Sequence, residues 1–386
     1  MSTHLARRIL LTVLFAVVTT TNSHANLTRP AGPLWVSADY LMLWTESSEV
    51  PPLVTTSPAG TDLLNAGVLG QPGTRTLLGG NLNNDMRSGF RLQGGVWMDC
   101  CRTLGFQLDY FQLETLNETF QAANHGDPIL ARPFTDATNG DRIAELATYP
   151  GTVTGGIDAS VQSEGLYDWG GNLLYSLCSY ECNCLSEQLY FAFGYRGLRL
   201  SDQVRIREQL TSSIFAAGTL LDLQDEFSTK NTFHGANFGL LYRRQRANLG
   251  IDTYANVAIG ATESWVNIDG QTTITSPFFS TIEHEGGLLA LSSNMGRTRH
   301  ADFAAIFDIG LNLRYQIHDQ IWLRTGYSFL FWPQVYRAGR QIDTVVNPNL
   351  LPPANIVAND PVRPARPNRQ TDYWAQGLNV GLELRY

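Results

Sequence analysis

The chain has 386 residues, of which 43% are hydrophobic and 16% charged, with 27 basic and 35 acidic residues. The net charge of −8 argues against nucleic acid as a partner. The 35 Gly, 17 Pro and 11% aromatic residues suit a β protein that is rich in turns.

The first 25 residues have the pattern of a secretory signal peptide. Arg7 and Arg8 give a positive start, residues 9–18 form a short apolar run, and Ser23-His24-Ala25 is a cleavage site of small residues. A membrane-spanning helix needs about 20 apolar residues, so this run is too short to be an anchor. We therefore predict that residues 1–25 are removed on export and that residues 26–386 form a single domain.

Alternation of apolar and polar residues predicts ten long strands after the signal peptide. In each strand every second residue is apolar, and the residues between are mostly polar. The predicted ranges are about 34–44, 88–98, 103–113, 161–176, 188–199, 232–243, 248–261, 302–316, 320–332 and 373–386.

The connections between these strands alternate strictly between short and long. The short ones lie at 99–102, 177–187, 244–247 and 317–319, and the long ones at about 45–87, 114–160, 200–231, 262–301 and 333–372. Short turns at one end and long loops at the other are typical of a barrel in the bacterial outer membrane. The predicted fold is therefore an all-β, antiparallel, up-and-down transmembrane barrel of ten strands, or twelve if segments near 204–224 add a hairpin.

A recurring Leu-x-Tyr pattern supports this arrangement. It places Tyr175, Tyr242, Tyr315 and Tyr386 near the ends of four strands that run in the same direction. In a barrel these residues share one level, at which a girdle of aromatic residues meets the membrane surface.

The two faces of the predicted strands differ in charge. One face has no Asp, Glu, Lys or Arg, and a charge facing lipid at mid-bilayer would cost about 2–4 kcal/mol. The other face mixes acids and bases almost evenly, which predicts ion pairs across a narrow or plugged lumen. The candidate lumen-lining residues are Arg91, Asp109, Asp168, Arg196, Asp252, Asp308, Arg314, Arg324, Glu383 and Arg385.

Five Cys residues fall in two predicted turns at the same end of the barrel. Since the third and fourth strands should be neighbours and export permits disulfides, one or two disulfides could join these turns. The odd count leaves at least one thiol unpaired or bonded to another chain. A zinc site is the alternative, but the Cys-x-x-Cys pattern is missing. The candidates are Cys100, Cys101, Cys178, Cys182 and Cys184.

Catalytic and metal chemistry have less support. His300 with Asp302 is the one pairing suited to hydrolysis at a predicted outer strand end, and no matching acid pair accompanies it. Glu283-His284-Glu285 could ligate a metal only with further ligands. We therefore predict that the protein is not an enzyme and has no cofactor and no metal site.

Five short motifs, several of them in predicted loops, resemble a known family. The stretches at 51–60, 127–134, 233–236, 268–274 and 371–378 are similar to the seventh of the numbered "putative beta-barrel porin" families. The resemblance extends from Trp35 to Tyr386 and implies a bacterial outer-membrane barrel, without assigned catalytic or ligand-binding residues.

Together these observations predict a porin-like protein of unknown solute in the bacterial cell outer membrane. The alternative is a structural or interaction protein that displays its loops on a barrel scaffold, and a minor alternative is an outer-membrane hydrolase. The expected partners are outer-membrane lipid, the barrel assembly machinery that inserts such chains and molecules at the cell surface, with no nucleic acid.

Overall fold

Ten antiparallel strands close a barrel in the computed structural model, which describes residues 33–182, 185–214, 217–355 and 359–386. Each barrel strand pairs with the barrel strands before and after it in the sequence, and the last one, β18, pairs with the first, β1, to close the ring. The ten-stranded prediction is confirmed. The barrel strands are β1 (Leu34–Thr45), β4 (Arg87–Trp97), β5 (Leu104–Leu113), β10 (Tyr167–Cys182), β11 (Leu185–Ser212), β12 (Leu220–Arg246), β13 (Leu249–Ser276), β15 (Gly296–His318), β16 (Ile321–Tyr336) and β18 (Gln370–Arg385).

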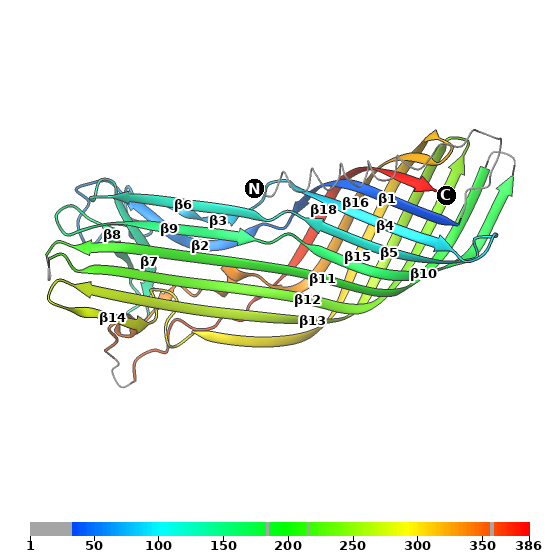
Figure 1. The fold of residues 1–386 in the computed structure, drawn as a ribbon. Coiled ribbons are helices and arrows are strands. Elements are labelled where there is room, and N and C mark those ends of the chain that lie inside the picture. The colour runs from blue at the N-terminus through cyan, green and yellow to red at the C-terminus, as the bar shows by residue number, and fades with distance from the viewer. Residues whose placement is uncertain (1–32, 183–184, 215–216, 356–358) are drawn as a thin grey trace.

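The short connections lie together at one end of the barrel, near the C-terminus (Figure 1). The prediction of a turn at 177–187 was too long, because β10 continues to Cys182 and β11 begins at Leu185. Cys178 therefore lies within β10, where it pairs with Leu189, and not in a turn. The Ser, Cys and Tyr residues of this segment do not alternate with apolar ones. The alternation that predicts a strand therefore stops several residues before the hydrogen bonding between β10 and β11 does.

Three strands continue far beyond the barrel at its other end. β11, β12 and β13 have 28, 27 and 28 residues, whereas a membrane-spanning strand needs about 9–11. β9 (Val153–Ser163) pairs with β11, β6 (Leu116–Asn124) with β9, and β14 (Phe279–Glu285) with β13. The connections at 114–160, 200–231 and 262–301 are long, as predicted, but they consist largely of strands and not of loops. Residues near 204–224 do pair as a hairpin, but as the continuation of β11 and β12, so the ring keeps ten strands.

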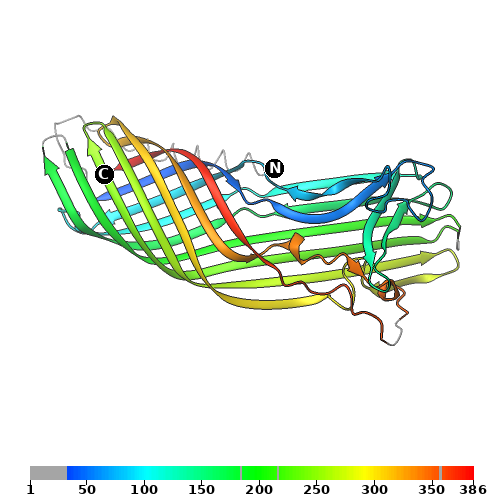
Figure 2. The ribbon, with the colours of Figure 1, turned by 180° about the vertical axis from the view of Figure 1, so that it is seen from behind.

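A second sheet covers one face of this extension (Figure 2). Its strands are β2 (Ser48–Ser57), β3 (Arg75–Leu82), β7 (Ile129–Asp136), β8 (Arg142–Thr148) and β17 (Val345–Val346), with the short 3-10 helices η1 (Ala338–Gln341) and η2 (Pro348–Leu350) after β16. Leu53 and Leu130 from this sheet join Val204 and Phe227 from the extension in one buried apolar core. We call the extension and this sheet the distal sandwich.

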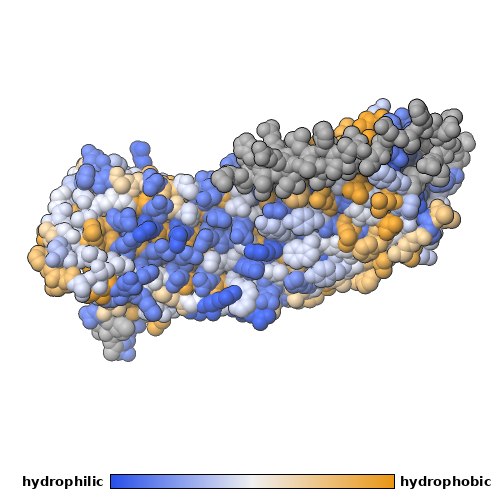
Figure 3. All heavy atoms as spheres, viewed as in Figure 1, coloured by the Kyte–Doolittle hydropathy of each residue, from blue (hydrophilic) through white to orange (hydrophobic). Residues whose placement is uncertain are grey.

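The outward residues of the barrel strands are apolar and remain exposed, as in Phe193, Leu311 and Val380. Along the extension the outward residues become polar, and Figure 3 shows hydrophilic side chains gathered over this region and hydrophobic ones on the barrel. From Leu249 to Ile259 the apolar face of β13 rises roughly 25 Å at the usual strand rise and tilt. That height matches the apolar band of a transmembrane barrel. No helix within the described residues is long and apolar enough to cross a membrane.

Candidate functional site: the barrel lumen

Aromatic rings lie flat across glycines inside the barrel and fill much of its width. A Cβ added to Gly95 would lie 2.6 Å from the ring of Trp35, and one added to Gly310 would lie 2.5 Å from the ring of Tyr254. Any larger residue at these glycines would displace the ring. Ten strands give a lumen only slightly wider than one that side chains can fill, so these rings narrow it substantially.

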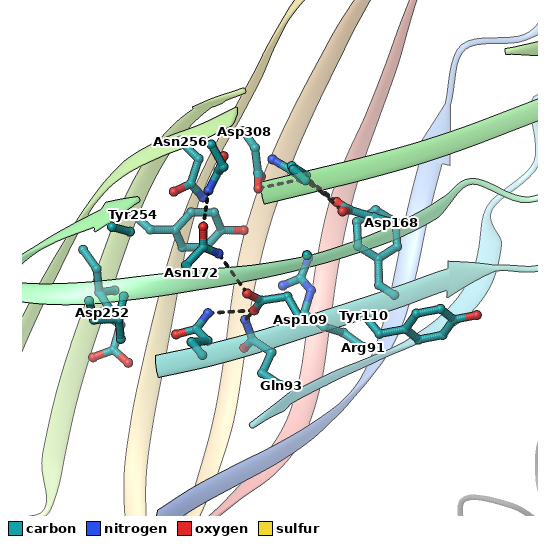
Figure 4. Close-up of a pocket in the computed structure, with 18 of the residues that line it drawn as sticks. Arg91, Gln93, Asp109, Tyr110, Asp168, Asn172, Asp252, Tyr254, Asn256 and Asp308 are labelled. Atoms are coloured by element: carbon teal, nitrogen blue, oxygen red, sulfur yellow. Dashed lines mark hydrogen bonds and ion pairs between the residues drawn. The ribbon is translucent and has the colours of Figure 1, made fainter. Parts of the chain in front are cut away.

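A layer of charged and amide side chains crosses the middle of the barrel (Figure 4). Arg196 bonds Asp168 at 2.5 Å and Asp308 at 3.1 Å. Asp109 has no arginine at bonding distance among the described residues and accepts hydrogen bonds of 2.7 Å from Gln93 and Gln107. Arg91 lies over the ring of Phe111, with 5.7 Å between its Cζ atom and the ring centroid.

A second group of ion pairs lies nearer the end with the short turns. Arg314 bonds Asp252 at 2.7 Å, and Arg385 bonds Glu383 at 2.5 Å. Arg324 lies 3.9 Å from both Glu383 and Asp39. All ten residues predicted to line the lumen thus point inward, and eight of them belong to these close pairs or to the Asp168–Arg196–Asp308 group. Whether they contact a solute stays a prediction.

A cavity of about 110 Å³ lies within the polar layer. Since one water molecule needs roughly 10–15 Å³ of such space, the cavity can hold several waters. Sequence reasoning missed its neutral members, Tyr254, Asn172 and Asn237, of which Asn237 donates to Asn172 at 2.9 Å. Their inward position in the alternation is the signal that could have found them, since neutral polar residues on that face also line the lumen.

Apolar residues close the barrel above the polar layer, on the side of the distal sandwich. Phe233 and Trp332 meet edge to face with 6.5 Å between ring centroids, and the indole Nε1 donates to Thr262 at 3.0 Å. This apolar layer includes residues from eight of the ten barrel strands and was not predicted from the sequence. Its members are Leu41, Leu43, Phe111, Leu113, Leu166, Leu198, Leu200, Phe233, Ala258, Ala304, Ile306, Leu330, Trp332, Val335, Tyr373 and Ala375.

The residues considered for disulfides, hydrolysis and metal binding lie as follows. Cys100, Cys101 and Cys178 are exposed and unbonded, and the side chains of Cys182 and Cys184 lie outside the described part, so the disulfide prediction stays a prediction. The ring of His300 stacks on Tyr336 at 4.7 Å, and Asp302 accepts from Gln370 instead. Within the described ranges, no group of three or more His, Cys, Asp and Glu is placed to hold a metal.

The distal sandwich contains a separate buried ion cluster. Arg132 bonds Glu208 and Asp225 at 2.6 Å each, and all three side chains are almost fully buried. Burial raises the pKa of Glu145 to about 8, and the neighbouring Glu208 carboxylate adds to this effect. Burial also raises the pKa of Glu208 itself, although Arg132 opposes that shift. The cluster therefore holds three acids around one guanidinium.

The closed ring of ten strands, the exposed apolar band and the polar interior define a transmembrane β-barrel protein of the outer-membrane type. A comparison of the sequence with family models gives a match to "Putative beta barrel porin-7" over residues 35–386. The chain belongs to this family, and it is an outer-membrane β-barrel. No curated protein matches the sequence.

The solved structures that match this chain are distant in sequence and have low TM-scores. The outer membrane protease OmpT from Escherichia coli is 9% identical, with 94% of this chain and 100% of that chain covered and a TM-score of 0.44. A FadL homologue from Pseudomonas aeruginosa is 9% identical, with 92% and 89% covered and a TM-score of 0.21. A mutant of the monoaromatic hydrocarbon channel TodX is also 9% identical, with 93% and 91% covered and a TM-score of 0.20.

Proposed function

We propose that this protein is a closed outer-membrane barrel that carries a rigid β platform at the cell surface. The observation that supports this proposal is the apolar layer across the lumen. An ion or polar solute crossing it would lose its water among Phe233, Trp332 and Tyr373, which are fully buried. Apolar constrictions of this kind block conduction because they exclude water. The barrel then acts as an anchor, and the distal sandwich is the part that meets surface partners.

The platform is suited to such a role because its strands are continuous with the barrel wall. β11 and β12 pair without interruption from Leu185–Arg246 at one end to Thr211–Leu220 at the other. A continuous ladder of this length has no flexible linker at which the platform could swing. Long segments outside the membrane are commonly the functional part of a barrel protein.

A second candidate is a gated path for a small polar solute. The observation in its favour is the cavity of about 110 Å³, lined by Arg91, Asp109, Arg196 and other polar groups. Charged rings of this kind select among solutes in open pores. Conduction would require the apolar layer to move, since it lies between the cavity and the distal end of the barrel.

Single-channel recording in planar bilayers separates the two candidates. For the closed barrel we expect no conductance steps from the wild type and steps from the double variant F233A/W332A, in which the two central rings are removed. The matched control is F227A, because Phe227 is a buried ring of the distal sandwich and not of the lumen; it should stay silent. Steps from the wild type whose ion selectivity changes in R196Q would support the solute path and contradict our proposal.

We also propose that the protein is not a hydrolase. In the described part of the chain His300 makes no hydrogen bond to Asp302, and its Nε2 atom is buried without a partner. A general base needs access to its substrate and an orienting acid. Release of product from peptide or ester substrates by the purified barrel, lost in H300Q, would overturn this proposal.

A further inference from the structure

A compact group of basic residues surrounds one tryptophan on the outer face of the molecule. Lys230 of β12 pairs in register with Trp265 of β13, which in turn pairs with Arg299 of β15. The guanidinium of Arg297 lies 3.9 Å above the ring centroid of Trp265, and that of Arg299 lies 5.4 Å from it. We call Lys230, Trp265, Arg297 and Arg299 the Trp265 patch.

The patch lies just above the apolar band. Phe303 of β15, Ala261 of β13 and His234 of β12 pair side by side and so lie at one level of the barrel wall. The Phe303 side chain is 71% exposed, as expected where the lipid-facing surface ends. Arg299 lies four residues before Phe303 in β15, toward the distal sandwich, and so roughly 10 Å higher at the usual rise and tilt. Long basic side chains reach back toward the membrane surface, so their charged ends lie at the level of the lipid headgroups.

The charge of this patch is not balanced by its neighbours. Glu263 accepts hydrogen bonds from Arg299 at 2.9 Å and from the Trp265 indole at 2.8 Å, and so fixes the position of both. It neutralises one of three cations. Lys230 is exposed and makes no ion pair within the described ranges, and Arg297 contacts the ring face. Two positive charges therefore remain available.

Other basic residues of the same outer face provide a contrast. Arg205 pairs with Glu226 at 3.5 Å and Arg207 with Asp222 at 2.5 Å, so these two cations, further from the membrane on β11, each have an acid of their own. Such exposed pairs are ordinary solvated charges. The surplus occurs where the strands leave the apolar band, which points to an anionic ligand held in the membrane.

We propose that the Trp265 patch binds the phosphate group of a phosphorylated glycolipid in the outer leaflet. Arg297 can donate two hydrogen bonds to phosphate oxygens while its guanidinium stays on the Trp265 ring, Lys230 adds a point charge, and Arg299 retains N–H groups that Glu263 does not use. The lipid chains would lie on the exposed apolar residues below, beginning with Phe303. This proposal requires that the barrel spans the membrane, but it does not depend on whether the lumen is closed.

Native mass spectrometry of the full-length protein, released from detergent and titrated with diphosphorylated lipid A, tests the proposal. Each basic residue near a lipid surface contributes about 1 kcal/mol, which corresponds to about fivefold in affinity. We expect R297Q/R299Q to bind lipid A roughly 10- to 30-fold more weakly and K230Q about fivefold more weakly. The matched control R205Q/R207Q, which also removes two exposed arginines of this face, should bind like the wild type.

Lipid A without phosphates and inorganic phosphate serve as the two further probes. Weak binding of dephosphorylated lipid A, together with no competition from millimolar inorganic phosphate, supports a lipid headgroup site. Full competition by inorganic phosphate would overturn it in favour of a free-anion site. Equal loss in both double variants, or no loss in R297Q/R299Q and K230Q, would also overturn it. All variants should keep the heat-dependent gel mobility of a folded barrel, and none of these outcomes affects the conductance test of the closed lumen.

Discussion

The barrel and the distal sandwich share the strands β11, β12 and β13 but have opposite polarity. Along β11 the outward residues of the barrel are Phe191, Phe193 and Tyr195, and the inward series reaches Arg196. A few residues later Arg199 and Arg205 point outward, while Val204 points into a buried core. The pairing of β11 with β12 continues through this change without a register shift. The solvent around the strand therefore changes while its geometry does not.

The two regions also bury charge in different ways. The lumen spreads its charges over many pairs and amides around a cavity that can hold water, as with Asp109 and its two glutamine donors. The sandwich concentrates three acids on Arg132 in a core of apolar residues, and Asp225 additionally accepts backbone hydrogen bonds from residues 288–290. The acids of this cluster thus share one cation, Arg132, and we expect its loss to cost more than the loss of one cation in the lumen.

Removal of that partner is the largest effect we predict. In Arg132→Met, Glu208 and Asp225 lose the cation that compensates their burial, which should destabilise the distal sandwich by about 3–5 kcal/mol. Hydrogen exchange should show lost protection in β7 and β8, whereas heat-dependent gel mobility should show an intact barrel.

Arg207→Met is the control for this change. Arg207 also pairs with an acid at 2.5 Å, but it is half exposed, so its loss should cost no more than about 1 kcal/mol. If both variants behave alike, or if Arg132→Met also unfolds the barrel, the two regions do not differ as we describe.

The second largest effect should come from a charge placed on the outer face, which should destabilise the barrel more than the distal sandwich. Leu311→Arg puts a guanidinium in the apolar band, at a cost of about 2–4 kcal/mol near mid-bilayer. Thr119→Arg places the same group on the exposed outer face of β6, where the change should stay within about 0.5 kcal/mol. Urea unfolding in liposomes measures both, and an equal cost at the two sites would contradict the placement of the membrane.

The pH dependence of the sandwich is a smaller effect. Because burial raises the pKa of Glu145 to about 8 in the folded state, above the usual value of about 4.3, the folded protein binds more protons between these values. Stability should therefore fall as the pH rises from about 4.5 to 8 and then level off, by on the order of 1–3 kcal/mol. Hydrogen exchange in β8 at pH 5 and pH 8 should show this, and E145Q should remove most of the difference.

Much of the barrel was predictable because lipid enforces a strict pattern. Residues such as Leu311, Leu313 and Tyr315 must be apolar on one face, and this alternation located all ten strands and the direction of Arg196 and Asp308. The distal strands were not found because their outward residues face water and their inward residues vary. Polar Asp202 and Glu208 interrupt the apolar series of Val204 and Ile206.

The apolar layer was missed for a related physical reason. At the level of Leu198, Phe233 and Trp332 the strands carry apolar residues on the inward face, a few residues from the apolar outward ones. The alternation of apolar and polar residues is then weaker, and nothing in one strand indicates that its inward apolar residue belongs to a layer across the lumen. Only the closed ring shows that these residues, distant in sequence, meet across the lumen.

The most direct test of the change in polarity is a spin-label scan of the odd-numbered positions from 191 to 205 on β11, in a variant without the native cysteines. We expect labels at 191, 193 and 195 to collide mainly with lipid-soluble oxygen, and labels at 199, 201, 203 and 205 mainly with a water-soluble nickel complex. Lipid exposure that continues to position 201 or beyond, or water exposure at position 193, would contradict our placement of the membrane boundary between Tyr195 and Arg199.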